Sequence, residues 1–450
     1  MIDMESFLLV GSGAREHAIA ESICRNEGVR LFAFMSANNP GIAALCKKSG
    51  GQAAIGGMHS PQAVVAFAKK YSPALVFPSP DAVLAAGVSD ALIKEGIPCA
   101  APTREAARLE WDKSYCRELL KDYRVPCSPK FGIFEDAAEA ASFIDSLSGA
   151  VAVKPSGLTG GKGVKVTGYQ LRDGEEAKKY AGELLSAKHG GLATIVIEEK
   201  LEGEEFSLQA FSDGKSIFPM PLVQDHKRAY EGDVGPNTGG MGSYSDSNHL
   251  LPFIKLSHKE EAISIMQKTI GAFRKKTGKP FVGILYGGFM VTAQGVKLIE
   301  YNARFGDPEA MNVLSILESD LFGILSGMAN GCLGKAPKFE KKATVCKYLV
   351  PDGYPGKSIV GQPLEINYAK IASAGANLFY ASVEEKEGTV CTQSSRSIGL
   401  VGIAGTIAEA ERVAEDACSA VSGKVWHRKD IGTPALLQRR IDHMKALGAI

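Results

Sequence analysis

Apolar runs separated by helical patterns fill the first hundred residues, and they constrain the fold more than any other feature. The runs are Phe7–Val10, Leu31–Met35, Ala74–Phe77 and Ile97-Pro98. Short strands that alternate with helices are typical of parallel sheets, because parallel neighbours must be joined by long crossover connections. We therefore predict an α/β protein, built partly of α+β modules, in which residues 1–102 form a Rossmann-like domain around a parallel sheet.

The length of the chain requires further domains. It has 450 residues, whereas a single hydrophobic core rarely serves more than about 250–300 residues. Thr103 and Glu105 have the pattern of a helix start, and we place there the beginning of a second domain, residues 103–330. The loop-like run from Gly331 to Pro337 opens a small, strand-rich C-terminal domain, residues 331–450.

The second domain divides into two parts by its strand pattern. A small lid is predicted at about residues 113–190, where two apolar runs flank a glycine loop, and the remainder extends over about 191–325. The runs Ala150–Val153 and Val164–Thr167 belong to the lid, and Thr194–Ile197 belongs to the remainder. In the C-terminal domain, Thr406 and Glu409 form a capping box before a helix expected from Ile407 to about Ser422.

Composition and charge exclude several classes of protein. The net charge is +1, so no general attraction to nucleic acid or to an anionic membrane is expected. The nine cysteines include no C-x-x-C pair and fit reduced, buried thiols. The start, Met1–Glu5, has no basic region before an apolar run, and no later run approaches the length of a membrane span. We expect a cytoplasmic protein with small-molecule partners, present as a monomer or weak dimer.

Residues 297–309, KLIEYNARFGDPE, have the clearest chemical pattern. Alternating strand residues point to one side, so Glu300, Asn302 and Arg304 are expected to share a face at spacings of roughly 7 Å. A carboxylate and an amide oxygen suit Mg²⁺, which commonly takes one or two carboxylates with phosphate oxygens and water. A guanidinium can grip a carboxylate or a phosphate with two hydrogen bonds. Read alone, the segment is more typical of an exposed strand end with scattered charges, and only the other motifs of the chain favour a site.

The first glycine-rich motif, Gly11–His17, follows an apolar run and precedes a helix. Such turns bring backbone amides close to a phosphate. A nicotinamide-dinucleotide domain would carry an acidic residue after its second strand, whereas here that strand leads into Ser36–Gly41 without one. The motif therefore favours a sugar phosphate over a dinucleotide. A turn that only packs the helix on the strand is the alternative.

The second glycine-rich motif, Lys154–Gly163, differs from a P-loop. Ser156 occupies the position of the first glycine, and Gly163 follows Lys162 in place of Ser or Thr. It also joins two predicted strands. Its glycines and lysines can still fold over a polyphosphate, with backbone amides as donors. A flexible hairpin without a ligand is the alternative reading.

Two further segments are rich in polar residues. Val196–Ser207 contains a short acidic linker between strands, which can offer backbone groups to adenine and a carboxylate to ribose. Gln224–Gly242, QDHKRAYEGDVGPNTGGMG, combines charges of both signs with a glycine-rich turn. That composition is costly to bury, so it indicates a surface loop or a binding site. His226 could serve as a base, although an ordinary loop histidine fits the sequence as well.

These motifs, in this order, resemble the ATP-grasp ligases. The N-terminal GSGAREH, the paired QDHKR and GPNTGGMG, and the late EYNARFGDPE are similar to the phosphoribosylamine–glycine ligase family within that superfamily. The similarity extends from Phe7 to about Ile431. It implies a two-part ATP-grasp core between the N- and C-terminal domains.

The resemblance also implies roles for individual residues. ATP phosphates would be held by Lys113, Lys154, Gly160, Gly161, Lys162 and Gly163. Adenine would meet Glu198 and Leu201, and ribose would meet Glu205. Glu300 and Asn302 would bind Mg²⁺ or Mn²⁺, and Asp225, Lys227 and Arg304 would be catalytic. The other substrate contacts would come from Gly11, Gly13, Arg15, Glu16, Asn39, Pro40, Gly41, Asp81, His226, Arg228, Asn237, Thr238, Gly239, Gly240, Asp307 and Arg396.

The family pattern is not followed everywhere. Asp81 stands where the family commonly has glutamate, Ser394-Ser395 stands where it has two glycines, and Phe379-Tyr380 replaces a more polar pair. All three differences fall on the sugar-phosphate side, so they bear on the substrate contacts more than on the ATP half.

The implied reaction joins glycine to 5-phosphoribosylamine and yields glycinamide ribonucleotide, ADP and phosphate through glycyl phosphate, in purine biosynthesis. Three alternatives stay open. Another carboxylate–amine ligase of the same fold would share the ATP residues. A nicotinamide oxidoreductase would use Gly11–His17 but leave residues 154–309 unexplained. An ATP sensor without activity would not need Glu300 and Asn302.

Overall fold

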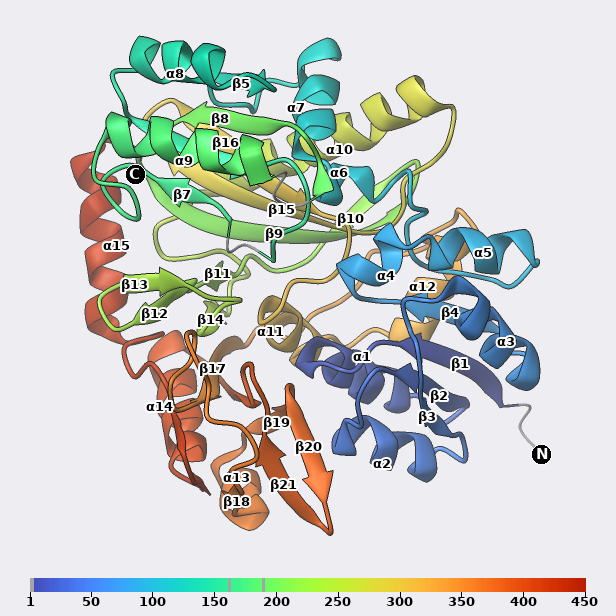
Figure 1. The fold of residues 1–450 in the computed structure, drawn as a ribbon. Coiled ribbons are helices and arrows are strands. Elements are labelled where there is room, and N and C mark those ends of the chain that lie inside the picture. Colours follow the sequence, from blue (N-terminus) through green and yellow to red (C-terminus); the bar gives the residue numbers. More distant parts are fainter. Residues whose placement is uncertain (1–3, 161–162, 188–190) are drawn as a thin grey trace.

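The computed structural model describes residues 4–160, 163–187 and 191–450. Figure 1 shows the N-terminal domain in blue, with the sheets of the second domain above it and the C-terminal strands β19–β21 beside it. The N-terminal domain contains a parallel sheet in the order β3-β2-β1-β4. Its strands are β1 (Glu5–Val10), β2 (Val29–Met35), β3 (Ala53–Ile55) and β4 (Leu75–Pro78). Its helices are α1 (Ala14–Cys24), α2 (Pro40–Lys48), α3 (Pro61–Tyr71), α4 (Asp81–Ala85) and α5 (Val88–Lys94).

The prediction of a parallel sheet is confirmed, but one of its strands was wrong. The predicted strand at Ile97-Pro98 is absent, and Cys99 makes only an isolated bridge to Val76. The fourth strand is instead β3 at the far edge. It consists of only three residues, Ala53–Ile55, and none is fully buried, so its apolar run is too short to be recognised as a strand.

The small sheet of the second domain is antiparallel, in the order β5-β8-β6-β7. Two short helices, α6 (Arg108–Trp111) and α7 (Lys113–Asp122), lead into it. The strands are β5 (Phe131–Phe134), β6 (Val151–Pro155), β7 (Lys165–Val166) and β8 (Ile195–Glu199), and the covering helices are α8 (Ala137–Ser146) and α9 (Gly174–Ala187).

Strand β8 was assigned to the wrong part of this domain. The sequence places it in the larger remainder, whereas in the structure it pairs with both β5 and β6. Ile195 and Ile197 are buried in the small core beneath α8 and α9. The chain after α9 therefore supplies β8 as an inner strand of the lid sheet. The hinge to the next sheet lies at residues 200–203.

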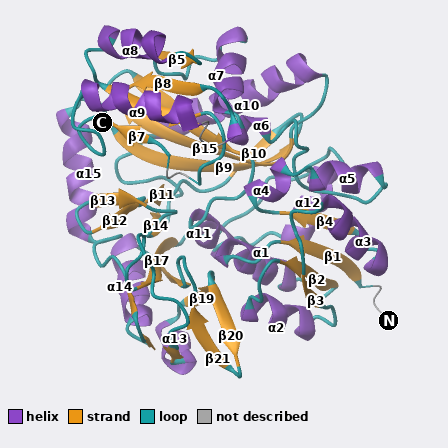
Figure 2. Cartoon of the chain, in the orientation of Figure 1, coloured by secondary structure: helices purple, strands orange, loops and turns teal. Residues whose placement is uncertain are grey.

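The large sheet lies against the small one and has the order β10-β9-β15-β16. Its strands are β9 (Glu204–Asp213), β10 (Ile217–Pro219), β15 (Val282–Thr292) and β16 (Gly295–Asn302). Helices α10 (Leu256–Thr277) and α12 (Leu321–Ala329) pack against it. Figure 2 shows the two sheets stacked in the upper half of the molecule, with helices on their outer sides.

The C-terminal sheet continues a sheet that begins in the second domain. Its order is β11-β14-β17-β22-β19, and β24 also pairs with β17. Strands β11 (Gln224–Asp225) and β14 (Gly242–Ser245) flank the polar motif, whose hairpin is β12 (Arg228–Tyr230) and β13 (Val234–Asn237). The later strands are β17 (Ala343–Pro351), β19 (Asn377–Tyr380), β22 (Ile398–Ala404) and β24 (Val425–Trp426). The polar motif is thus built into the interface with the C-terminal residues.

The remaining elements are short except for two helices. They are α11 (Glu309–Ser315), α13 (Tyr368–Ala374), α14 (Ile407–Cys418), α15 (Pro434–Ala446), β18 (Glu365–Ile366), β20 (Val383–Lys386), β21 (Thr389–Thr392) and β23 (Val421–Ser422). The predicted helix from Ile407 ends at Cys418 and not near Ser422, because Val421 and Ser422 pair with β18. Thr406 caps it by accepting a hydrogen bond from the Glu409 amide.

Among the described residues, no helix combines the length and the apolar character needed to cross a membrane.

Candidate active site

Three charged side chains from separate elements meet between the small and large sheets. Lys113 begins α7, Lys154 lies on β6 and Glu300 lies on β16. The Lys113 ammonium donates to the Gly157 carbonyl at 3.3 Å, and the Lys154 ammonium donates to the Ile299 carbonyl at 3.0 Å. A cavity opens beside them, lined by Leu109, Lys113, Cys116, Arg117, Lys154, Glu198, Ile299, Glu300 and Tyr301.

Glu198 holds two of the basic groups of this cleft in place. Its carboxylate lies 2.7 Å from Arg117 Nε and 2.8 Å from Lys154 Nζ, and all three side chains are buried. Burial opposes ionisation, but Arg117 and Lys154 outweigh it and lower the pKa of Glu198. Although the resemblance assigns Glu198 to adenine, the structure engages its carboxylate in orienting Lys154.

Glu300 is surrounded by cationic groups. Lys227 Nζ lies 3.4 Å from its carboxylate. Burial works against the charge, but Lys227, Lys113 and other nearby cations outweigh it and lower the pKa of Glu300 to about 2. The carboxylate is therefore ionised at neutral pH. Asn302 lies two residues further along the strand, and its amide oxygen accepts from Arg304 Nη2 at 3.2 Å.

Arg304 lies where the N-terminal domain meets the large sheet. Its Nη2 is 3.1 Å from the buried carboxylate of Glu110, and its Nη1 donates to the Phe305 carbonyl at 3.1 Å. Glu110 also accepts from the Ala303 amide at 2.8 Å. Burial raises the pKa of Glu110 to about 7, against the pull of Arg304. Glu110 thus fixes both the backbone and the guanidinium of the 303–304 segment.

Two carboxylates, the half-buried Asp225 and the buried Glu309, lie close together near this part of the site. Asp225 ends β11 and Glu309 begins α11, where its carboxylate accepts from the Tyr286 hydroxyl at 2.8 Å. Burial, followed by the charge of Glu309, raises the pKa of Asp225 well above its ordinary value. Within the described part of the chain, Asp225 Oδ1 has no hydrogen-bond partner. Such a pair favours a proton or a ligand cation between its members.

The glycine-rich turn after the hairpin is held by Arg396. Its Nη1 donates to the carbonyls of Gly239 at 2.7 Å and Gly240 at 3.0 Å, and its Nη2 lies 3.1 Å from Asp307 Oδ2. Asp307 also accepts from the Tyr348 hydroxyl at 2.6 Å. Gly240 has a φ of +108°, and a Cβ there would lie 2.5 Å from Asp225 Oδ1. The turn can approach Asp225 only because this residue is glycine.

The first glycine motif forms a tight turn at the start of α1. Glu16 accepts from the Gly13 amide at 2.7 Å, from Arg15 Nε at 2.6 Å and from the Ser79 hydroxyl at 2.6 Å. Arg15 Nη1 donates to the Phe305 carbonyl at 3.1 Å. The side chains of Arg15 and Glu16 therefore tie the turn to the 303–307 segment, while Gly11 keeps the backbone open beside them.

The second half of the predicted sugar-phosphate site joins the N- and C-terminal domains. Asn39 caps α2 by accepting from the Gly41 amide, and its Nδ2 donates to the Tyr380 carbonyl at 2.8 Å. Pro40 is the first residue of the helix. His17 Nδ1 accepts from the Tyr380 amide at 2.9 Å, and a Cβ at Gly41 would lie 2.0 Å from the His17 ring. The Phe379-Tyr380 segment thus holds Asn39 and His17 of the N-terminal domain in place.

Other predicted residues lie around these groups. Asp81 begins α4, and its negative charge helps to raise the pKa of both Glu110 and Arg304. Arg228 donates to the Gly235 carbonyl, and its guanidinium lies 5.3 Å from the ring centre of Tyr169 in the lid. Thr238 donates to the Lys227 carbonyl at 3.0 Å. Gly160 and Gly163 follow β6, Leu201 lies in the hinge, Glu205 lies on β9 just after it, and Asn237 ends β13. Gly161 and Lys162 lie outside the described residues.

His226 differs from the expectation of a loop histidine. Its side chain is 1% exposed, and burial lowers the pKa of its ring to about 3. Neither ring nitrogen has a partner among the described residues. His226 is therefore neutral at pH 7 and lies beneath the hairpin, behind Asp225 and Lys227.

Two buried neutral histidines predict a loss of stability in acid. The folded-state pKa values of His17 and His226 are about 4 and about 3, below the unfolded value of 6.5. Their contribution is complete above pH 6.5 and is lost as the pH falls toward the folded values. At pH 5 each histidine lowers the free energy of unfolding by about 2 kcal/mol relative to neutral pH. Urea unfolding at pH 7.5 and pH 5 should show this, and His226→Leu should shrink the difference by about 2 kcal/mol. An unchanged difference would contradict it.

Several residues at this site were not predicted from the sequence. Glu110 forms an ion pair with Arg304, and Arg117 forms one with Glu198. Glu309 accepts a hydrogen bond from Tyr286. Glu309 belongs to the KLIEYNARFGDPE segment, whose carboxylates the sequence places at this edge of the sheet, but no role was assigned to it. Glu110 and Arg117 are spaced like ordinary helical charges, and only the fold brings them to their partners.

Two stacked antiparallel sheets that enclose lysines and a strand-borne Glu-x-Asn define an ATP-grasp ligase. The family model for the ATP-grasp domain of phosphoribosylglycinamide synthetase matches residues 111–310, and the models for its N and C domains match residues 5–110 and 344–434. The chain belongs to the phosphoribosylamine–glycine ligase family.

Full-length relatives and solved structures agree with this assignment. Phosphoribosylamine–glycine ligases of Methanosarcina barkeri and Methanoregula boonei are 51% and 50% identical, over 98% of this chain and 99% of each relative. The crystal structure of the Thermotoga maritima phosphoribosylamine–glycine ligase has a TM-score of 0.80 at 26% identity, covering 94% of this chain and 99% of that one. Campylobacter jejuni biotin carboxylase has a TM-score of 0.75 at 15% identity, over 99% of both chains, which shows the shared fold.

Proposed function

We propose that the chain ligates glycine to 5-phosphoribosylamine with ATP, giving glycinamide ribonucleotide, ADP and phosphate. The observation that carries the proposal is the meeting of two sets of groups at β16. Lys113, Lys154 and Glu300 lie on the side of the lid, while Arg304 and Asp225 lie on the side of the hairpin and the N-terminal motif. A nucleotide and an amino acid can therefore be held end to end.

The residues present suit a divalent ion at the phosphate end. Among the described residues, no group of three or more His, Cys, Asp or Glu side chains could hold a metal. Mg²⁺ bound with phosphates needs fewer protein ligands. Glu300 is fully ionised and Asn302 offers an amide oxygen two residues away, so this pair would hold Mg²⁺ or Mn²⁺. When bound, the ion would neutralise phosphate charge during transfer.

The glycine end is supplied by opposite charges. The guanidinium of Arg304 suits the carboxylate of glycine, and the carboxylates of Asp225 and Glu309 suit its ammonium group. The turn at Gly240 lies directly against Asp225, because a Cβ at Gly240 would come within 2.5 Å of Asp225 Oδ1. This arrangement favours glycine over larger acids, which is the feature that separates this reaction from that of another carboxylate–amine ligase.

The chemistry then requires positioning more than an activated nucleophile. A carboxylate oxygen of glycine attacks the γ-phosphorus of ATP, and ADP leaves. The amine of phosphoribosylamine attacks the acyl carbon, and phosphate leaves with the former carboxylate oxygen. Lys113, Lys154 and Lys227 neutralise charge on the transferred group, and Arg304 orients the attacking carboxylate. The Gly11–Arg15 turn and the Asn39–Gly41 helix start would receive the phosphoribosyl group.

The test is ADP release with each substrate omitted in turn. With ATP, glycine and freshly generated 5-phosphoribosylamine, we expect ADP and glycinamide ribonucleotide in equal amounts. Omission of either acid or amine should stop sustained release. Equal or faster release with a different acid–amine pair would assign the chain to another reaction of the same fold.

A further inference from the structure

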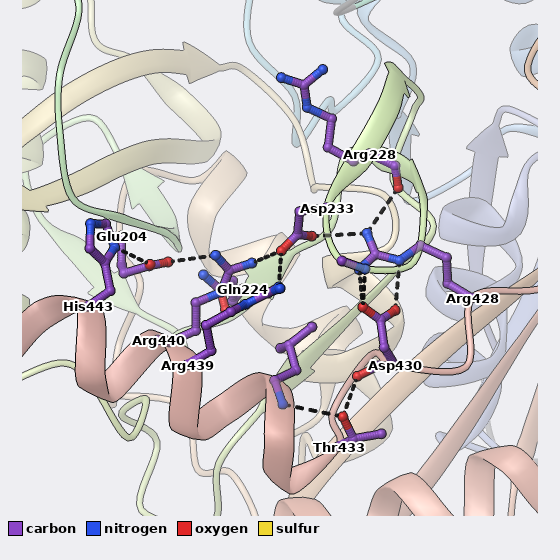
Figure 3. A network of polar contacts seen from close by, with 12 residues as sticks. Glu204, Gln224, Arg228, Asp233, Arg428, Asp430, Thr433, Arg439, Arg440 and His443 are labelled. Carbon is purple, nitrogen blue, oxygen red and sulfur yellow. Dashed lines mark hydrogen bonds and ion pairs between the residues drawn. The ribbon is translucent and has the colours of Figure 1, made fainter. Parts of the chain in front are cut away.

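The C-terminal helix α15 contacts the site at two places that the sequence analysis did not consider. It runs along one side of the molecule, next to the large sheet and the hairpin β12–β13 (Figure 1). Thr433 caps the helix and Pro434 is its first residue. Two arginines of this helix form ion pairs with carboxylates of β9 and of the hairpin, and a histidine of the helix forms a hydrogen bond with the β9 carboxylate (Figure 3).

The first contact is with the hairpin. Asp233 lies in its turn and pairs with Arg428 at 3.0 Å, with Arg439 at 2.8 Å and with Arg440. Burial opposes ionisation of Asp233, but the surrounding cationic groups outweigh it and lower its pKa to about 2. The fully buried Arg428 also donates to the Arg228 carbonyl at 3.0 Å and pairs with Asp430 at 2.7 Å. The position of the hairpin is therefore set by charged groups that come from residues 428–440.

The second contact is with the start of the large sheet. The buried carboxylate of Glu204 lies 3.1 Å from Arg440 Nη1 and 2.6 Å from His443 Nδ1. Neighbouring residues in a strand face opposite sides, so Glu205 faces away from α15. Burial opposes the charge of Lys227, but Glu300 and Glu205 outweigh it and raise its pKa. Glu204 thus fixes the start of β9. The next residue of this strand, Glu205, acts through its charge on Lys227 in the reaction cleft.

Arg440 is the residue that joins the two contacts. One of its terminal nitrogens is paired with Glu204 and the other with Asp233, as Figure 3 shows. A planar guanidinium can span two carboxylates in fixed geometry, which a lysine cannot do. Among the described residues, Arg439 forms an ion pair with Asp233 alone, and its side chain is 49% exposed. The same helix therefore offers a matched control.

We propose that Arg440 is a positioning residue for the ligation. It fixes the hairpin, which carries Lys227 and leads to the Thr238–Gly240 turn, against the strand that carries Glu205. The nucleotide half and the glycine half of the cleft are thereby held at the spacing that transfer needs. This inference rests on the proposed function for its substrates, but nucleotide binding tests it separately.

We expect the substitution to weaken the binding of ATP and of glycine selectively. In Arg440→Met, the KM for ATP and the KM for glycine should each rise about tenfold, equivalent to about 1.4 kcal/mol. The KM for phosphoribosylamine should change less than twofold, because its site is built from α1, α2 and β19. Arg440→Lys should fall between Arg440→Met and the wild type, and Arg439→Met should stay within twofold of the wild type throughout.

Binding of a non-hydrolysable ATP analogue with magnesium, measured by calorimetry, provides the second readout. Its Kd should rise about tenfold in Arg440→Met whether or not ligation of glycine is the reaction. Assays are run well below each variant's Tm, and Arg440→Lys replaces Arg440→Met if the latter does not fold. A lowered Tm with unchanged KM and Kd values would overturn the proposal, as would equal effects in Arg439→Met. A wild type that binds nucleotide but makes no product would count against the proposed function alone.

Discussion

Glu300→Gln is expected to lower kcat by about two to three orders of magnitude, the size of effect that loss of one preorganised electrostatic group produces. The substitution preserves shape but removes the negative charge that a divalent ion and three surrounding lysines require. Glu300 has a pKa lowered to about 2, so the wild-type side chain is charged under all assay conditions near neutrality. Steady-state turnover at several magnesium concentrations measures the effect.

The matched control is Glu261→Gln. Glu261 accepts from the Val296 amide at 3.3 Å, at the opposite end of the same strand, and is exposed. It should retain turnover within about twofold of the wild type, because exposed substitutions rarely matter. Circular dichroism and Tm should be similar in both variants. Near-normal turnover of Glu300→Gln at saturating magnesium would remove Glu300 from the proposed metal site.

Arg304→Lys is expected to lower kcat/KM for glycine by about 10²–10³, again the scale of one lost stabilising donor. The guanidinium contacts Glu110, Asn302 and the Phe305 carbonyl at 3.1–3.2 Å. A lysine supplies one point charge and cannot hold these groups and a carboxylate together. The KM for ATP should change much less, and kinetics with each substrate varied in turn separates the effects.

Arg25→Lys serves as the control for Arg304→Lys. Arg25 also donates to backbone carbonyls, those of Leu314 and Leu317, but lies away from the cleft. Its kinetic constants should remain within about twofold of the wild type. If Arg304→Lys behaves the same way, Arg304 has a structural role and does not bind the acid.

The positions of Glu300, Asn302 and Lys154 could be anticipated from the sequence because they depend on local strand patterns, whereas their roles toward ATP stay predictions. Glu300 and Asn302 alternate along β16, and Lys154 lies near the end of a strand that leads into a glycine loop, as strand geometry and residue type predict. The strand ends at Asn302, so the expectation that Arg304 continues the alternation was wrong, and Arg304 lies in the bend that follows. The same reasoning identified the parallel sheet of the N-terminal domain from its apolar runs.

The parts that could not be anticipated depend on contacts between distant segments. Strand β8 joins the lid because Ile195 and Ile197 fill its core, which no local pattern reveals. The sequence places Glu198 in a segment with an acidic linker, whereas in the structure it lies on β8 and binds Arg117, which is eighty-one positions earlier. His226 looked like a loop histidine, yet the C-terminal segment that forms ion pairs around the hairpin buries it. The sequence around Arg440 indicates a helix that starts at Thr433-Pro434, but nothing in it indicates the ion pairs of Arg440.

The central claim is that glycine is phosphorylated on its carboxylate before the amine attacks. The most direct measurement uses glycine labelled with oxygen-18 in both carboxylate oxygens and analyses the released phosphate by mass spectrometry. One labelled oxygen should appear in each phosphate formed, with the other retained in glycinamide ribonucleotide. Unlabelled phosphate, formed in step with product, would contradict the acyl phosphate route and with it the roles assigned to Glu300 and Arg304.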